Sequence, residues 1–139
     1  MERAIIQIAA GLKLARRILF ITGAGISADS GLPTYRGVGG LYNEENTDDD
    51  VPIEEALSGS MLRERPELTW KYLLEIEKAC RGASYNAGHR IIALVERHQP
   101  ETWVLTQNID EFHRSAGSRN VIEIHGRLRE LYCVECQYT

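Results

Sequence analysis

A glycine-rich stretch follows the first apolar strand-like run and has the spacing of a phosphate-binding turn. The segment GAGISA at 23–28 fits the pattern G-x-G-x-x-[G/A] and comes directly after the apolar residues 18–21. In this pattern Gly23 permits a tight turn, Gly25 lets the backbone approach a pyrophosphate, and N–H groups at the next helix start favour an anion. A tight turn without a ligand fits equally well. Residues 23–25, with Ala24 between the glycines, are therefore one candidate dinucleotide site.

An arginine stands a short interval after this stretch. Arg36 carries a planar, permanently charged guanidinium of the kind that closes over a phosphate or a ribose. A solvated surface arginine explains the residue equally well, so both interpretations stay open at this point.

A second polar group, TQNID at 106–110, ends the apolar run 102–106. The side chains of Gln107, Asn108 and Asp110 can hydrogen-bond sugar hydroxyls or an amide. Open α/β sheets bind ligands at the carboxyl ends of their strands, which is where these residues would lie. Asp110 is also placed to cap a helix that begins near residue 111, and capping leaves Gln107 and Asn108 unexplained.

A histidine follows the third apolar run, 121–124. His125 would lie at the same edge of the sheet, and histidine is suited to general base catalysis near neutral pH. A lone histidine is usually structural, and we expect that role for His89, His98 and His113, which lie inside helical patterns. Only its position distinguishes His125 from them.

Two cysteines near the end of the sequence have the spacing of metal ligands. Cys133 and Cys136 form C-x-x-C and can supply two thiolates to zinc. A closed tetrahedral zinc site needs four ligands, so only half of a set is present. A pair of free thiols is the alternative. Cys80, on the apolar face of a predicted helix, is expected in a core.

The elements that must position these residues alternate between helix and strand. Strands are expected at 18–21, 102–106 and 121–124, the first being continuously apolar as in a strand buried on both faces. Helices are expected at 2–15, 52–57, 66–80, 86–98 and 109–116. This order predicts the α/β class with a parallel sheet.

Composition narrows the possible partners and compartment. The chain has 139 residues, of which 43% are apolar and 26% charged, and a net charge of -4. These values fit one globular domain and do not favour nucleic acid as a ligand. We expect no membrane segment and no signal peptide, because the apolar stretches are short and interrupted. Three cysteines without a disulfide framework favour the reducing cytoplasm.

The motifs together resemble the sirtuin family of NAD-dependent protein lysine deacylases. The match is to an ordered set, GAGISADSGLPTYR at 23–36, TQNIDEFHRSAG at 106–117, EIHG at 123–126 and CVEC at 133–136. The resemblance implies a Rossmann-like sheet with a helical lobe and a small zinc-binding module, with NAD as cofactor. It implies a sheet part at 1–126, with a helical insertion at about 43–98, and the start of the zinc module at 127–139.

The resemblance also implies roles for individual residues. His125 matches the catalytic base, and Asn108 and Asp110 match polar residues at the reacting centre. The positions matching the family's cofactor-binding residues are Gly23, Ala24, Gly25, Tyr35, Arg36, Gln107, Asn108 and Asp110. Tyr35 is a mild departure, since that aromatic is usually phenylalanine. Cys133 and Cys136 match the first half of the zinc ligands.

The implied reaction transfers the acyl group of an acyl-lysine peptide to ADP-ribose and releases nicotinamide. Family members that prefer acidic acyl groups carry a tyrosine and, three residues later, an arginine on the helix lining the acyl pocket. The matching stretch here, WKYLLEIE at 70–77, has an acid in place of that arginine. A neutral acyl group, most simply acetyl, is expected.

The chain departs from the family pattern by lacking its later motifs. The second cysteine pair and the Gly-Thr-Ser stretch that binds the rest of NAD are not in the sequence. One hypothesis is a deacylase in truncated form, whose function is that of the family even if this chain by itself is inactive. The alternative is a non-catalytic module that binds NAD, ADP-ribose or a partner, as a homodimer in which two CVEC pairs share one zinc. A generic oxidoreductase would explain 23–28 but neither TQNID nor EIHG.

Overall fold

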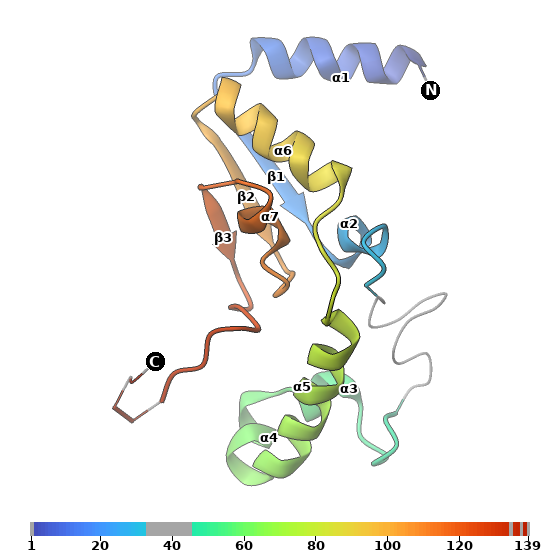
Figure 1. The fold of residues 1–139 in the computed structure, drawn as a ribbon, viewed down its shortest axis with the longest axis vertical. Coiled ribbons are helices and arrows are strands. Elements are labelled where there is room, and N and C mark those ends of the chain that lie inside the picture. Colours follow the sequence, from blue (N-terminus) through green and yellow to red (C-terminus); the bar gives the residue numbers. More distant parts are fainter. Residues whose placement is uncertain (1, 33–45, 134, 137, 139) are drawn as a thin grey trace. The chain divides into compact units, whose positions relative to one another are not determined.

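The computed structural model describes residues 2–32, 46–133, 135, 136 and 138 (Figure 1). The chain divides into two compact units, one of residues 1–23 and 85–139 and the other of residues 24–84. The first unit holds the sheet and the second is helical. Each is described by itself.

Three parallel strands form the sheet of the first unit. They are β1 (Ile18–Thr22), β2 (Thr102–Thr106) and β3 (Val121–Glu123), in the order β1-β2-β3. Ile18 pairs with Thr102, and Val104 pairs with Val121 on the other side of β2. The predicted α/β class and parallel sheet are confirmed. Because both pairings are parallel, the carboxyl ends of all three strands lie at one edge.

One face of this sheet is covered and the other is exposed. On the covered face, Val104 is fully buried and α6 (Ala87–His98) packs against β2, while α7 (Phe112–Ser115) packs against α6. On the other face Leu19 is 54% exposed, Ile21 69% and Trp103 45%. The prediction that the first strand is buried on both faces is therefore wrong. The described helices of this unit bury one side of the sheet only.

The first helix, α1 (Glu2–Leu14), is confirmed one residue shorter than predicted. It contributes no buried residue, and Ile5, Ile6 and Ile8 are each at least 60% exposed. Among the described residues, no helix has the length and apolar character needed to cross a membrane.

In its described residues the second unit has four helices, and the last three of them enclose a small core. The four helices are α2 (Ala24–Ala28), α3 (Ile53–Ala56), α4 (Gly59–Glu64) and α5 (Pro66–Cys80). Ile53, Leu68 and Tyr72 are the large buried apolar side chains of this core. The Thr69 hydroxyl donates to the Ala56 carbonyl at 2.7 Å and fixes α5 on α3.

Helix α4 is the one helix of this unit that the sequence did not predict. Ser58 caps it, accepting a hydrogen bond from the Met61 N–H at 3.1 Å. Such a cap satisfies a donor that a short helix leaves free. With six residues the helix is too short to show a clear periodicity in the sequence.

A buried carboxylate ties α6 to the segment that enters β3. Glu96 is 9% exposed, and its two oxygens accept hydrogen bonds from the backbone N–H of Arg119 at 3.0 and 3.1 Å and of Asn120 at 3.0 Å. The Asn120 amide in turn donates to the Thr102 carbonyl at 3.0 Å. These hydrogen bonds fix the position of the start of β3 relative to β2 and α6.

Two buried histidines join α6, α7 and β1. His89 and His113 are 0% and 2% exposed, with ring centroids 4.8 Å apart. His113 Nε2 lies 2.9 Å from the Thr22 hydroxyl, and His89 Nδ1 lies 3.0 Å from the side-chain Oδ1 of Asn86 in the capping box of α6. The structural role predicted for these two residues is confirmed. Burial, together with the nearby His89, lowers the pKa of His113 from its ordinary 6.5 to about 4.

We predict that Glu96→Gln lowers the free energy of unfolding by about 1–3 kcal/mol, because an amide cannot accept all three backbone N–H bonds and leaves a buried donor unpaired. Urea unfolding monitored by circular dichroism measures the change. Glu101→Gln is the matched control: Glu101 is exposed and pairs with Arg17 at 3.4 Å, and its loss should change stability by less than about 0.5 kcal/mol. Equal effects of the two substitutions would contradict the role given to Glu96.

We predict that the protein loses stability as the pH falls from about 6.5 to about 4. The unfolded chain protonates His113 below 6.5, whereas the folded chain resists protonation until about pH 4. The unfolded state therefore binds more protons in this window, and folding weakens by about 1–2 kcal/mol between pH 7.5 and 5. Urea unfolding at both pH values tests this. His113→Gln should show a flatter dependence and the exposed His98→Gln the wild-type one; an unchanged slope in His113→Gln would refute the assignment.

Candidate functional site

The candidate site lies where the three strands end (Figure 1). Gly23 follows β1, residues 107–111 follow β2, and residues 124–126 follow β3. The backbone pairing continues past the strands, since the Gln107 N–H donates to the Thr22 carbonyl and the Ile124 N–H to the Thr106 carbonyl, both at 3.1 Å. The three segments that carry the candidate site residues therefore follow neighbouring strands at the same edge of the sheet.

Asn108 connects two of these segments directly. Its side-chain amide donates to the Gly23 carbonyl at 3.1 Å, across 85 residues of sequence, and its own N–H donates to the Thr106 hydroxyl at 3.1 Å. Asn108 is half-buried, while Gln107 next to it is exposed. The structure thus brings the polar segment and the first glycine together, as the sequence predicted for one edge of the sheet.

Asp110 hydrogen-bonds to the first residue of the short helix that follows. Its carboxylate accepts the Phe112 N–H at 2.9 Å, but the N-cap position itself is Glu111, so the predicted Asp110 N-cap is wrong by one residue. Helix α7 begins at Phe112, later than predicted, because Glu111 adopts a left-handed backbone with φ 61°. The Ile109 carbonyl accepts the Leu128 N–H at 3.0 Å, which holds this loop to the segment beyond β3.

His125 lies exposed in a turn just after β3. Gly126, with φ 77°, closes that turn, and its N–H donates to the Glu123 carbonyl at 3.2 Å. The Glu123 carboxylate forms ion pairs with Arg114 at 2.9 Å and Arg127 at 3.1 Å, and its side chain is only 6% exposed. These pairs brace the two sides of the turn that presents His125 to solvent.

Sequence reasoning did not identify the bracing residues Arg114, Glu123 and Arg127. Glu123 and Arg127 are four residues apart on either side of the turn, which is a spacing visible in the sequence. Their pairing depends on the turn at Gly126, and charged residues on a surface helix or turn usually lack a partner. The signal was present but not specific.

Among the described residues, no neighbouring atom would prevent a side chain at Gly23 or Gly25, the two glycines that follow β1. A Cβ built on Gly23 or Gly25 meets no atom within 4 Å, and neither residue has a positive φ. Open space in front of both backbones is what a phosphate cradle requires, because a side chain would fill it. The residues therefore fit a bound pyrophosphate. Ala24 is the first residue of α2 and is half-buried. Tyr35 and Arg36 lie outside the described residues.

The two C-terminal cysteines are exposed thiols close to each other in sequence. Hydrogen bonds from the backbone N–H groups of Cys136 and Glu135, and from the Cys136 thiol, lower the pKa of Cys133. A lowered thiol pKa favours the thiolate form that binds zinc. No group of three or more metal-ligating side chains occurs in the described residues, so the donor set fits half of a zinc site.

Comparison with known proteins agrees with this geometry. The model of the Sir2 family matches residues 23–139. The chain is 60% identical over 134 residues to "NAD-dependent protein deacylase 2" of Pseudomonas syringae pv. tomato, covering 95% of this chain and 54% of that protein. It is 61% identical to the protein of the same name from Pseudomonas aeruginosa, with 95% and 52% covered. The chain thus spans about half the length of these relatives.

Solved structures agree with the sequence relatives. A Sir2 variant described with a deacetylated p53 peptide and 3'-O-acetyl ADP ribose superposes with a TM-score of 0.82 at 32% identity, covering 96% of this chain and 51% of that one. A Sir2 homolog–NAD complex gives a TM-score of 0.76 at 35% identity, covering 91% and 47%. Since the family model spans residues 23–139, which is most of the sequence, this chain belongs to the Sir2 family.

Proposed function

We propose that the protein acts as an NAD-dependent protein lysine deacylase, with acetyl-lysine as the simplest substrate. The carrying observation is the hydrogen bond from Asn108 to the Gly23 carbonyl, which joins the polar segment to the open glycine turn at the carboxyl edge of the sheet. Membership of the Sir2 family and the names of the relatives support the reaction class. In this reaction NAD supplies the electrophilic ribose carbon and nicotinamide as the leaving group.

The chain's own residues would divide the work between binding and proton transfer. Gly23, Ala24 and Gly25 would hold the phosphates with backbone N–H groups, and Gln107, Asn108 and Asp110 would orient the nicotinamide ribose. Tyr35 and Arg36, which match cofactor-binding positions of the family, would contribute to the same site. His125 would accept the proton of a ribose hydroxyl, a role that suits an exposed histidine held on a braced turn.

The preference for a neutral acyl group also remains a proposal. Within α5, Tyr72 is followed three residues later by Glu75 and not by an arginine. Tyr72 is 1% exposed and belongs to the core of the helical unit, so its ring is committed to packing. An acidic acyl group would find no arginine at that spacing here.

A second candidate, a non-catalytic module that binds NAD or ADP-ribose and dimerises, has its own observation in favour. The face of the sheet with Leu19, Ile21 and Trp103 is apolar and exposed. Exposed apolar faces of this kind commonly mark association surfaces.

The three cysteines are free thiols, which fits the reducing cytoplasm that we propose as the location.

We predict that the chain releases nicotinamide from NAD in the presence of an acetyl-lysine peptide, and that His125→Ala lowers the rate by about 10²–10⁴-fold through loss of the base. His98→Ala is the matched control, since His98 is exposed at the end of α6 and should leave the rate unchanged. Release that is insensitive to His125→Ala would contradict the assigned base. NAD binding without release would favour the second candidate.

We predict that Cys133 and Cys136 bind zinc and that two chains share one ion, because each chain offers two of the four ligands. Metal analysis together with native mass spectrometry should find one zinc per dimer. Cys133→Ser should abolish it, while Cys80→Ser, on α5 of the helical unit, should not. A zinc-free monomer of the unsubstituted protein would refute both the site and the shared ion. The module that begins at 127 would then lack a metal in this chain.

A further inference from the structure

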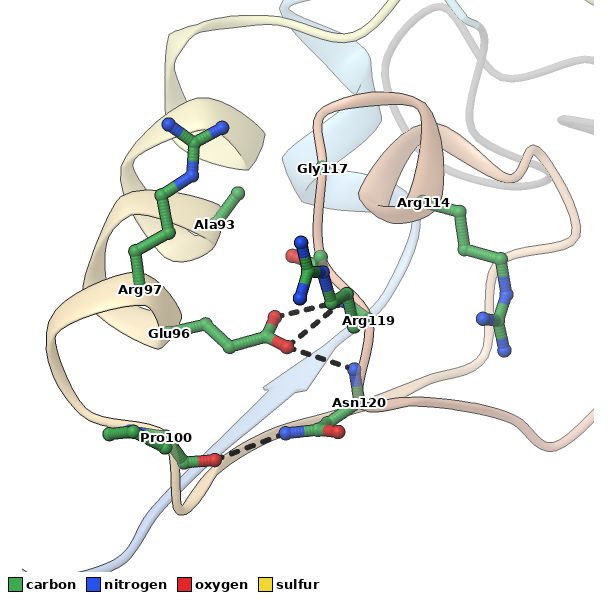
Figure 2. A pocket seen from close by; sticks show the side chains of 9 residues that line it. Ala93, Glu96, Arg97, Pro100, Arg114, Gly117, Arg119 and Asn120 are labelled. Atoms are coloured by element: carbon green, nitrogen blue, oxygen red, sulfur yellow. Dashed lines mark hydrogen bonds between the residues drawn. The ribbon is translucent and has the colours of Figure 1, made fainter.

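A pocket lies at the edge of the sheet opposite the candidate site. The last turn of α6, the segment entering β2 at Pro100 and the segment entering β3 at Asn120 surround it (Figure 2). Its volume is about 760 Å³, and every lining residue belongs to the first unit. Small-molecule sites typically have volumes of about 300–1,000 Å³, so the pocket is large enough for a ligand of nucleotide size.

Three arginines and one carboxylate line this pocket, which leaves an excess of positive charge. Arg114 is committed to structure, because its guanidinium pairs with Glu123 and donates to the Val121 carbonyl, both at 2.9 Å. Within the described part of the chain, Arg97 and Arg119 have no carboxylate within ion-pair distance. Figure 2 shows the Glu96 carboxylate engaged with the backbone N–H groups of Arg119 and Asn120. Two guanidinium groups are therefore uncommitted.

A buried hydroxyl without a partner lies among the same lining residues. Ser118 is 4% exposed, and its Oγ has no hydrogen-bond partner among the residues that the structure describes. Gly117 beside it has φ 106°, and a Cβ built there would lie 3.5 Å from Arg97 Nη2. The Arg97 guanidinium thus lies against the turn that carries Ser118. Buried polar groups in native proteins almost always have partners, so the lone hydroxyl indicates a missing acceptor.

We propose that this pocket binds the phosphate group of a small molecule, held by Arg97, Arg119 and the Ser118 hydroxyl. A guanidinium is planar and can donate two parallel hydrogen bonds to phosphate oxygens. Two guanidinium groups and a hydroxyl together offer more donors than the two oxygens of a carboxylate can accept, which favours phosphate. Binding then depends on the arginines. The proposal is independent of the deacylase reaction.

Titration of the whole chain with pyrophosphate, followed by amide chemical shifts, tests the proposal. We expect saturable binding, with shifts at residues 117–119, that the double variant Arg97→Gln/Arg119→Gln weakens at least 10-fold. Ser118→Ala should weaken it by a smaller factor. Arg90→Gln is the matched control, because Arg90 is exposed on the same helix and does not line the pocket.

Three outcomes would overturn the proposal. The first is the absence of saturable binding, and the second is equal affinity in the double variant and the Arg90→Gln control. The third is tighter binding of malonate than of pyrophosphate, which would assign the pocket to carboxylates. Chemical-shift changes confined to residues 23–25 and 107–110 would place pyrophosphate at the candidate dinucleotide site. That result would also overturn the proposal. Salt dependence of the affinity, measured in parallel, should be weaker in the double variant.

Discussion

The parallel pairing of β2 with both of its neighbours is the constraint on which the other features depend. Because all three strands run the same way, everything that follows a strand gathers at one edge and everything that precedes a strand gathers at the other. Gly23, Asn108 and His125 follow three different strands and leave the sheet at the same edge for this reason. The same rule places Pro100 and Asn120, which precede β2 and β3, beside the arginine pocket. An antiparallel β3 would separate His125 from the other two.

The covered face of the sheet is held by polar as well as apolar contacts. Thr102 and Thr106 of β2 are only 0% and 2% exposed, and His89 of α6 and His113 of α7 are buried with their ring centroids 4.8 Å apart. Buried polar groups are costly unless they are paired, and their geometry is more exacting than that of aliphatic side chains. The bond between His113 and Thr22 therefore fixes where α7 lies against the end of β1. That position also fixes the loop 107–111, because α7 follows it directly.

The strength of each local signal explains how much could be predicted. The runs at 18–21 and 102–106, and the long periodic pattern at 66–80, gave their elements almost to the residue. Helix α4 depends on one serine cap, and the burial of Leu19 and Ile21 depends on what packs against the sheet, which an apolar run does not reveal. At the site, the partners of Asn108 and Glu123 are tertiary contacts. Residue type identified Asn108 as a candidate, but only the fold shows that its amide reaches Gly23.

Arg114 lines the pocket but does not offer its positive charge to a ligand. Its side chain lines the arginine pocket, yet its guanidinium is satisfied by Glu123 and the Val121 carbonyl. Since Glu123 is 6% exposed, removing this partner would leave a nearly buried carboxylate with Arg127 alone. The pair is thus strongly held, and Arg114 is not free to neutralise an anion. The positive charge open to a ligand rests on Arg97 and Arg119, so substituting these two residues can test the pocket without loosening the turn that carries His125.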